Sequence, residues 1–248
     1  MPKLLDAVMF LNENEMFKRR MEYLDCVDMF IVVEANYTFS HNKKDYCFDE
    51  NLRNHPKVDY VQIDLSSDMD FSYNKRYADM NSPAWLSEYK HRNNLMKPLR
   101  KYSDDSLVLF SDLDEIPNKH KLLEILDTYD GADLLRFDLE AYQFDFRNYT
   151  GKHPGTALWT NENVLRFTPQ ECRRSAGIII QEGGWHLSYW GDAHRTLYKL
   201  QSFSHQEFAF IKDKEYVQSC MDNAKDLFGR TTSLTPLEVP QEILNIFS

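Results

Sequence analysis

The densest group of residues able to do chemistry lies in the run FSDLDEIP, residues 110–117, where three acids follow an apolar segment. Alternate residues of a strand share one face, so we expect Asp112 and Asp114 to converge on one point. Two such carboxylates repel each other unless a cation lies between them, and hard divalent cations prefer oxygen ligands. A cation held in this way keeps coordination positions for phosphate oxygens. The competing interpretation is that these acids only cap a helix that begins near Asn118.

This motif ends a strand in a chain whose first half alternates strands and helices. The patterns predict strands at residues 4–11, 28–35, 58–65 and 106–112, and helices at residues 14–24, 84–97 and 118–129. Such alternation is typical of βαβ units around a mainly parallel sheet. Ligands of open α/β sheets bind outside the carboxyl ends of the strands, so the motif is expected at the ligand-binding edge.

The second half of the chain has a different pattern, with more strands and fewer helices between them. We expect strands within residues 132–146, 163–167, 176–180 and 184–190, helices at 193–203 and 214–228, and an extended tail at 236–248. No linker or repeat interrupts the chain. The sequence therefore predicts a single α/β domain with a mixed C-terminal half of the sheet.

Composition excludes several classes of function. The 248 residues hold 29 Lys and Arg against 39 Asp and Glu, a net charge of −10 that argues against nucleic acid as the main partner. No apolar run is long enough for a transmembrane segment, and the N-terminus has no signal-peptide pattern. The first glycine is Gly131, so the first half cannot contain a dinucleotide-binding or P-loop glycine motif. The four cysteines lack C-x-x-C spacing, which indicates free thiols in a reducing compartment.

Several ordered segments resemble glycosyltransferase family 17, the family of the β-1,4-mannosyl-glycoprotein N-acetylglucosaminyltransferase. They are DAVMFLNENEM (6–16), DMFIVVEANYTFS (28–40), HRNNL (91–95), DDSLVLFSDLDEIP (104–117), GGWHLSYWG (183–191) and KLQSFSHQEF (199–208). The resemblance implies a GT-A-like single domain over residues 1–248. In it, residues 1–117 form a nucleotide-sugar-binding half, 118–235 an acceptor-side half and 236–248 a tail.

The same resemblance implies an activity. Family members of this kind carry out a metal-assisted, inverting transfer from a nucleotide sugar, and the animal members use UDP-N-acetylglucosamine. We therefore expect Mn²⁺ or Mg²⁺ as cofactor, a UDP-sugar as donor, and a glycan or lipid-linked saccharide as acceptor. A divalent cation stabilises the charge that collects on the leaving diphosphate.

The resemblance also implies roles for residues around the motif. Asp114 is the expected metal ligand, with Asp112 facing the ribose or the water shell of the metal and Glu115 in support. His186 is expected at the metal or the diphosphate, although a histidine on an apolar strand can equally be a satisfied core residue.

Three residues of the first half are expected to bind the donor. Glu34 and Asn36 match the family at the end of the second strand and are expected to line the nucleoside pocket, unless they only close a polar turn. Arg92 lies on the helix before the metal strand, where a guanidinium can pair with the diphosphate. A salt-bridged helix arginine is the alternative for Arg92.

The base that takes the proton of the acceptor hydroxyl is expected late in the chain. Asp192 precedes the predicted helix at 193–203 and is the first candidate, but an aspartate there can also be an N-cap. Glu140 is the reserve candidate. Aromatic residues of the 140–160 segment suggest either a sugar-stacking platform or core packing: Tyr142, Phe144, Phe146, Tyr149 and Trp159.

Two other functions remain open on the sequence alone. A phosphatase of the haloacid-dehalogenase type also carries D-x-D after a strand, but on its first strand. A non-catalytic carbohydrate-binding protein would explain the aromatic residues but not the acids at the end of a buried strand. The lack of a leader pattern favours work in the cytoplasm, with a peripheral position at the inner membrane face as an option.

Overall fold

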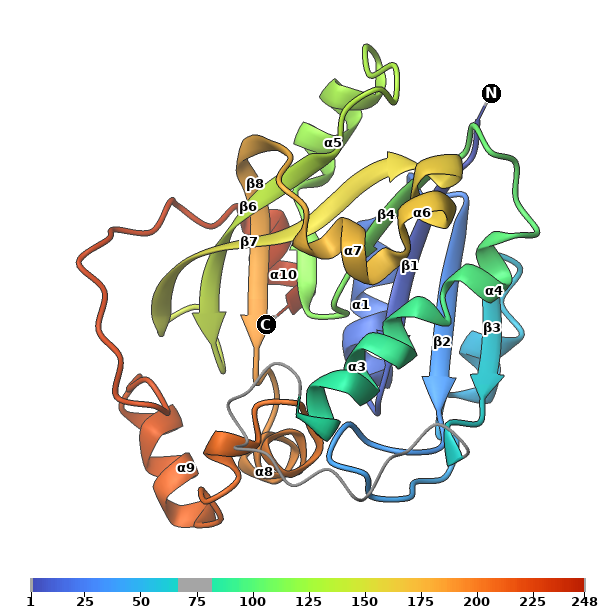
Figure 1. The fold of residues 1–248 in the computed structure, drawn as a ribbon. Helices are drawn as coiled ribbons and strands as arrows, with labels where there is room; N and C mark the ends of the chain where they lie inside the picture. The colour runs from blue at the N-terminus through green and yellow to red at the C-terminus, as the bar shows by residue number, and fades with distance from the viewer. Residues whose placement is uncertain (1, 67–81, 248) are drawn as a thin grey trace.

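The protein is described from a computed structural model, which describes residues 2–66 and 82–247. One eight-stranded sheet runs through these residues in the order β3-β2-β1-β4-β7-β6-β8-β5 (Figure 1). The strands are β1 (Leu4–Phe10), β2 (Met29–Ala35), β3 (Val58–Ile63), β4 (Leu107–Ser111), β5 (Glu115–Pro117), β6 (Leu135–Gln143), β7 (Tyr149–Thr160) and β8 (Ile178–Ser188). The helices are α1 (Asn14–Tyr23), α2 (Glu50–Arg53), α3 (Pro83–Asn93), α4 (Met96–Leu99), α5 (Lys119–Leu126), α6 (Asn161–Phe167), α7 (Pro169–Arg174), α8 (Ala193–Ser202), α9 (Lys214–Asp222) and α10 (Gln241–Phe247), with a 3₁₀ turn, η2, at Gln206–Phe208.

The sheet has a parallel half and a mixed half. Strands β3, β2, β1 and β4 are all parallel, so their carboxyl ends meet at one edge. In the other half, β7 is antiparallel to β4 and β6, β8 is parallel to β6, and β5 is antiparallel to β8. The expected mainly parallel sheet with a mixed C-terminal half is therefore confirmed.

Apolar residues of β1 face both sides of the sheet. Val8 and Phe10 belong to one core cluster, while Leu5 and Ala7 belong to the cluster on the opposite face. Strands buried on both faces read as continuous apolar runs, which explains the sequence LLDAVMF. Both faces must be covered for this strand to be stable.

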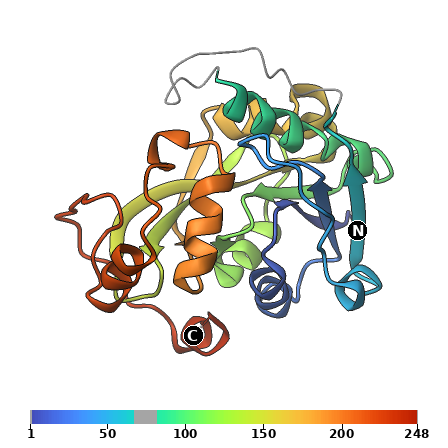
Figure 2. The same cartoon turned by 90° about the horizontal axis from the view of Figure 1, so that it is seen from below.

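Helices cover each face of the sheet and one of its edges. In Figure 1, α3, α6 and α7 lie on one face, and α1 and α10 lie behind the other. Figure 2 shows α8, in orange, across the middle of the molecule as seen from below, at the edge where the parallel strands end. Within residues 2–66 and 82–247, no helix is both long and apolar enough to cross a membrane.

Two predicted elements have a different type in the structure. Residues 163–167 belong to helix α6, not to a strand, because a short apolar run does not reveal its own period. The expected extended tail contains helix α10, whose Ile243 and Phe247 are spaced four apart and buried in the core.

Strand β7 was not predicted as a strand because Gly151, Pro154 and Gly155 interrupt its pattern. A Cβ at Gly155 would lie 2.3 Å from Leu139 Cδ1 and 3.0 Å from Glu115 Cδ. This glycine therefore lets the backbone of β7 pass close to the acidic motif.

Candidate active site

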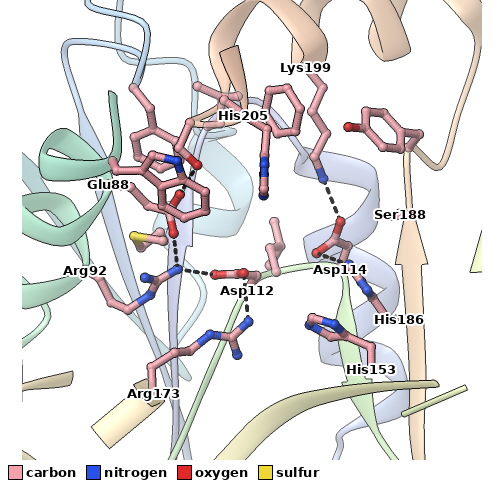
Figure 3. A pocket seen from close by; sticks show the side chains of 18 of the residues that line it. Glu88, Arg92, Asp112, Asp114, His153, Arg173, His186, Ser188, Lys199 and His205 are labelled. Atoms are coloured by element: carbon pink, nitrogen blue, oxygen red, sulfur yellow. Dashed lines mark hydrogen bonds and ion pairs between the residues drawn. The ribbon is translucent and has the colours of Figure 1, made fainter. Parts of the chain in front are cut away.

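A cavity of about 620 Å³ opens at the edge where the parallel strands end (Figure 3). Its walls come from the end of β1, from α3, α7, β8 and α8, and from the turn that carries Asp112 and Asp114. Arg92 and His186 also line it. Four predicted site residues are thus brought to one cavity.

The acidic motif is a turn between two strands. β4 ends at Ser111, and Glu115 N donates to Asp112 O over 3.0 Å before β5 begins. Because Asp112 and Asp114 lie in this turn, the face-sharing rule for strands does not apply to them. Both carboxylates line the cavity, and each one contacts its own pair of basic side chains, so their convergence on one cation stays a prediction.

A buried arginine, Arg20, donates hydrogen bonds to the turn. Arg20 on α1 and Asp6 on β1 form a fully buried ion pair with two contacts of 2.7 Å. The same guanidinium donates to the Leu113 carbonyl, to the Glu115 carbonyl and to Ser111 Oγ. The backbone of the motif is thereby tied to α1 and the first strand. The sequence analysis missed this anchor, although an aspartate inside a buried strand is a signal for a buried cation.

Asp112 is held between two arginines. Arg92 Nη2 lies 2.9 Å from Asp112 Oδ1, and Arg173 Nη2 lies 3.0 Å from Asp112 Oδ2. Burial raises the pKa of the Asp112 carboxyl, but Arg173 and Arg92 outweigh burial and hold that pKa below its usual value. Asp112 is therefore an ionised group that orients two guanidinium groups in the cavity wall.

Glu115 also contacts Arg173, but it does not line the cavity. It is fully buried, accepts a forked ion pair from Arg173, and lies 3.1 Å from His153 Nε2. Burial acts to raise its pKa, yet Arg173 and His153 keep the pKa well below the ordinary value. The predicted supporting role of Glu115 takes this form in the structure: it fixes Arg173.

Asp114 contacts a different pair of cationic groups. Lys199 Nζ on α8 lies 2.6 Å from Asp114 Oδ2, and His186 Nε2 on β8 lies 3.6 Å from Asp114 Oδ1. Burial opposes ionisation of Asp114, but Lys199 and His186 hold its pKa below the ordinary value. Burial likewise lowers the pKa of His186, and the neighbouring Asp114 raises it by more. Asp114 is thus the anionic centre of this part of the wall.

The cavity carries more fixed positive than negative charge, in contrast to the acidic chain. Among the described residues its lysines and arginines are Arg92, Lys152, Arg173, Arg174, Lys199 and Arg230. Its acids are Glu13, Glu88, Asp112 and Asp114. Concave walls of one charge concentrate ligands of the opposite charge, so the cavity suits an anion such as a diphosphate.

Aromatic side chains also line the cavity. We call this group the aromatic wall: Trp85, Tyr89, Phe203, Phe208 and Phe228. Trp85 and Tyr89 come from α3, and the three phenylalanines come from the segments after α8 and α9. A cavity lined by both aromatic and charged side chains suits a ligand with both a ring and phosphates.

Glu34 and Asn36 lie outside the residues that line the cavity. Glu34 is fully buried and binds Lys44, the backbone N–H of Cys47 and the hydroxyl of Tyr60. Asn36 pairs with Asp64 over 2.8 Å and accepts from Leu65 N over 3.0 Å. Both fasten the loop after β2 to its surroundings, which matches the polar-turn alternative.

The two predicted base candidates also lie away from the cavity lining. Asp192 is the N-cap of α8 and accepts from Arg195 N over 2.8 Å. Glu140 on β6 is buried, with Lys152 Nζ at 3.6 Å as its partner across the strands. The geometry thus favours the capping role for Asp192 and gives neither residue access to a ligand in the cavity.

The aromatic residues of segment 140–160 are core residues or pack outside the cavity. Tyr142 is buried and contacts Phe146 and Tyr149, and Trp159 stacks on Phe167. The apolar surface of the cavity comes instead from the aromatic wall. No separate sequence signal marks that wall, apart from the motif KLQSFSHQEF, which carries Lys199 and Phe203.

Comparison with a family model decides the class of this protein. Glycosyltransferase family 17 matches residues 1–233. The chain belongs to that family. Its activity class is therefore glycosyl transfer, and the GT-A-like α/β fold class predicted from the sequence is confirmed. The phosphatase and the non-catalytic carbohydrate-binding alternatives are set aside by the same match.

Solved structures give weaker likenesses to this family 17 transferase. 4-Diphosphocytidyl-2C-methyl-D-erythritol synthase has a TM-score of 0.45 at 9% identity, over 73% of this chain and 89% of that one. S. aureus TarS 1–349 has a TM-score of 0.36 at 12% identity, over 90% and 71%. The galactosyltransferase LgtC with donor and acceptor sugar analogues has a TM-score of 0.35 at 12% identity, over 97% and 99%. None of the curated proteins compared with the chain matches it.

Two side chains of the transferase fit a divalent cation. Asp114 offers a carboxylate oxygen and His186 an imidazole nitrogen at one place in the wall, and Mn²⁺ accepts both donor types. No group of three or more potential ligands is found within residues 2–66 and 82–247. Ions such as Mg²⁺ commonly use one or two carboxylates together with substrate phosphates, so a pair of protein ligands suits this class of site. The two oxygens of Asp112 contact Arg92 and Arg173, and its expected place among the metal ligands stays a prediction.

Proposed function

We propose that this family 17 transferase moves a sugar from a nucleotide sugar to a glycan acceptor, with inversion at the anomeric carbon. The observation that carries the proposal is a group of basic side chains around Asp112 and Asp114 in a chain of net charge −10. We call this group the cationic wall: Arg92, Arg173 and Lys199. A leaving nucleoside diphosphate gains negative charge as the glycosidic bond breaks. Fixed cations that face this charge lower the barrier because they need no reorganisation during the reaction.

The donor we propose is a UDP-sugar, with N-acetylglucosamine as the first sugar to test. Arg173 and Arg92 face the cavity as oriented guanidinium groups, since Asp112 and Glu115 hold them in place. Planar guanidinium groups bind phosphate oxygens through two parallel hydrogen bonds. Lys199 adds an ammonium group beside Asp114. These three cations are the proposed diphosphate site.

Asp114 and His186 are the proposed ligands of Mn²⁺ or Mg²⁺. Such an ion supplies positive charge to the diphosphate oxygens when it is bound. The role of the chain is to hold the carboxylate ionised, and the low pKa of Asp114 meets this need. The turn must also hold its shape, which is the contribution of Arg20 below it.

The acceptor we propose is the end of a glycan or a lipid-linked saccharide. Sugar rings have apolar faces that pack on aromatic side chains, and the aromatic wall lines the same cavity as the cationic wall. An acceptor lying there would present a hydroxyl to the anomeric carbon from the side opposite the diphosphate. Attack from that side inverts the configuration.

We propose the cytoplasm as the place of the reaction. Cys26, Cys47, Cys172 and Cys220 are all free thiols. Free thiols are typical of a reducing compartment, where nucleotide sugars are also made. Isolation of the native protein with disulfide bonds and N-linked glycans would contradict this placement.

The direct test is release of nucleoside diphosphate from a panel of nucleotide sugars, with a set of oligosaccharide acceptors, in Mn²⁺ or in chelator. We expect release that depends on both the sugar donor and the metal. Full turnover in excess chelator would overturn the metal-assisted mechanism. Absence of turnover with every donor and acceptor would overturn the nucleotide-sugar proposal.

A further inference from the structure

Among the residues that the structure describes, every carboxylate that lines the cavity already contacts another group, which leaves the base of the reaction to be found. Asp112 and Asp114 are each held by two cationic groups. Glu88 contacts Arg92 through one oxygen and the hydroxyl of Ser204 through the other. Glu13 Oε2 accepts two backbone N–H groups, those of Leu11 and Asn12, at 3.0 Å each. A carboxylate tied to cations or to N–H groups is a weak base.

Histidines are the other group of bases in the cavity. Among the described residues, His91, His153, His186 and His205 line it. His91 is buried and contacts the Val33 carbonyl through Nε2, and burial lowers its pKa to about 4. His153 Nε2 contacts Glu115, and His186 Nε2 lies beside Asp114. His91 is therefore a core residue, whereas His153 and His186 already contact the acidic motif through Nε2.

His205 has a different environment from the other three histidines. Its Nδ1 lies 2.7 Å from Glu207 Oε1, two residues along the chain. An ionised carboxylate accepts a hydrogen bond, so Nδ1 carries the proton and Nε2 carries the lone pair. No hydrogen-bond partner of Nε2 is found in the described part of the chain, and the side chain is 45% exposed. A bound substrate can therefore reach Nε2.

The position of His205 suits the acceptor side of the cavity. Its ring packs edge-on against Trp85, with centroids 4.7 Å apart, and lies 5.4 Å from the ring of Phe203. In Figure 3 it lies across the cavity from Asp112 and Asp114. Inversion requires the base on the side of the sugar opposite the leaving diphosphate. His205 stands on that side if the diphosphate lies on the cationic wall.

We propose that His205 is the general base of the transfer and that Glu207 positions it. This proposal rests on the proposed function. The acceptor hydroxyl oxygen forms a bond to the anomeric carbon, and its proton passes to His205 Nε2. The bond from the anomeric carbon to the diphosphate breaks, and its electron pair leaves on the diphosphate oxygen. Glu207 stabilises the imidazolium, as the carboxylate of a Ser-His-Asp triad does, and the proton is later lost to solvent.

The charged groups around His205 come from several elements. Glu88 on α3, Glu207 on η2, Lys199 on α8 and Arg230 after α9 line the same cavity or contact the ring. Any effect of pH on turnover must therefore be compared between variants of His205 and of Glu207.

The test uses the donor and acceptor pair with the highest turnover in the panel described above. His205→Gln removes the base, and Glu207→Gln removes the positioning carboxylate. His194→Gln is the matched control, because His194 lies on α8 outside the cavity lining and pairs with Lys214. Each variant is measured for kcat, for KM of the donor, for the pH profile of kcat/KM, and for the Tm shift caused by UDP with Mn²⁺.

We expect His205→Gln to lower kcat by about 10²–10⁴-fold with an unchanged UDP-induced Tm shift and without the acid limb of the pH profile. Glu207→Gln should lower kcat with an unchanged donor KM, because His205 Nδ1 has lost the carboxylate that orients the ring. His194→Gln should behave as the wild-type protein. If the wild-type protein turns over and His205→Gln keeps a near-normal kcat, the assignment of His205 as the base is overturned, whereas the proposed function is not. An inactive wild-type protein would instead overturn the proposed function, and this assignment with it.

Discussion

Lys199 Nζ on α8 and Asp114 Oδ2 in the turn after β4 lie 2.6 Å apart, although 85 positions separate them in the chain. This ion pair joins the carboxyl edge of the parallel half of the sheet to the helix that follows β8. Burial acts to lower the pKa of Lys199, and Asp114 raises it above its ordinary value. Both groups are therefore charged at neutral pH, and the pair marks where the two halves of the protein meet in the cavity.

Replacing Lys199 should weaken donor binding more than it affects folding. Lys199→Met keeps the length and apolar stem of the side chain but removes the ammonium group. We expect KM for the donor to rise by about 10- to 150-fold, because one charged contact to the diphosphate is worth about 1.5–3 kcal/mol. Lys214→Met is a matched control, since Lys214 lies on α9 outside the cavity lining. An unchanged donor KM in Lys199→Met would remove Lys199 from the diphosphate site.

The buried pair of Arg20 and Asp6 should carry both stability and the shape of the motif. Arg20→Met leaves a buried carboxylate without its cation, and we expect a loss of about 3–5 kcal/mol in the free energy of unfolding. The double variant Asp6→Leu with Arg20→Met removes both charges and should recover much of that stability.

Turnover separates the two roles of Arg20. In the double variant we expect kcat to stay low, because the carbonyls of Leu113 and Glu115 have lost their donor. Denaturant unfolding and kinetics on the same samples check this. A double variant with recovered stability and wild-type kcat would show that Arg20 contributes to folding only.

The buried acid Glu115 should make stability depend on pH. Its folded-state pKa lies well below the ordinary value, so the unfolded chain binds its proton first as pH falls. Its contribution is therefore present above about pH 5 and is lost as pH drops toward the folded-state pKa. In chelator, Tm should fall over this range, and Glu115→Gln should flatten the fall. Glu22→Gln, an exposed acid on α1, is the control and should follow the wild-type curve.

The aromatic wall should set acceptor affinity. Trp85→Ala is expected to raise KM for the acceptor about 10-fold, since an aromatic contact contributes about 0.5–1.5 kcal/mol beyond its buried area. Donor KM should stay near the wild-type value. Trp159→Ala is the matched control, because Trp159 stacks on Phe167 away from the cavity. A rise in donor KM alone would assign the wall to the nucleoside instead.

The sequence predicted the edge of the sheet at which the site lies better than it predicted the direction of individual side chains. Asp112 and Asp114 follow β4, Arg92 lies on α3 and His186 lies near the end of β8, and all four line the cavity. Glu34 comes from the same edge, but it points into the loop after β2 and is fully buried. The end of a strand fixes where a residue lies, whereas packing of the next loop decides where its side chain points.

The residues that complete the site depend on contacts between distant segments. Arg173 reaches the motif from α7, which lies in a region predicted without a helix, and Lys199 reaches it from α8. Their roles follow from how these helices pack against the sheet edge, which no local pattern encodes. Asp192, the first base candidate, shows that a correct position does not establish a role. It lies directly before a helix, as expected, but its geometry is that of a helix cap.

The most direct test of the proposed metal-assisted transfer compares the turnover of Asp114→Asn with that of Asp145→Asn. Asp114 is the proposed metal ligand, whereas Asp145 pairs with Arg147 in the turn between β6 and β7, outside the cavity lining. With UDP-sugar, acceptor and Mn²⁺, we expect a loss of at least about 10²-fold in kcat for Asp114→Asn. We expect wild-type kcat for Asp145→Asn, with both variants folded. Wild-type turnover in a folded Asp114→Asn protein would contradict the proposed role of Asp114 as metal ligand.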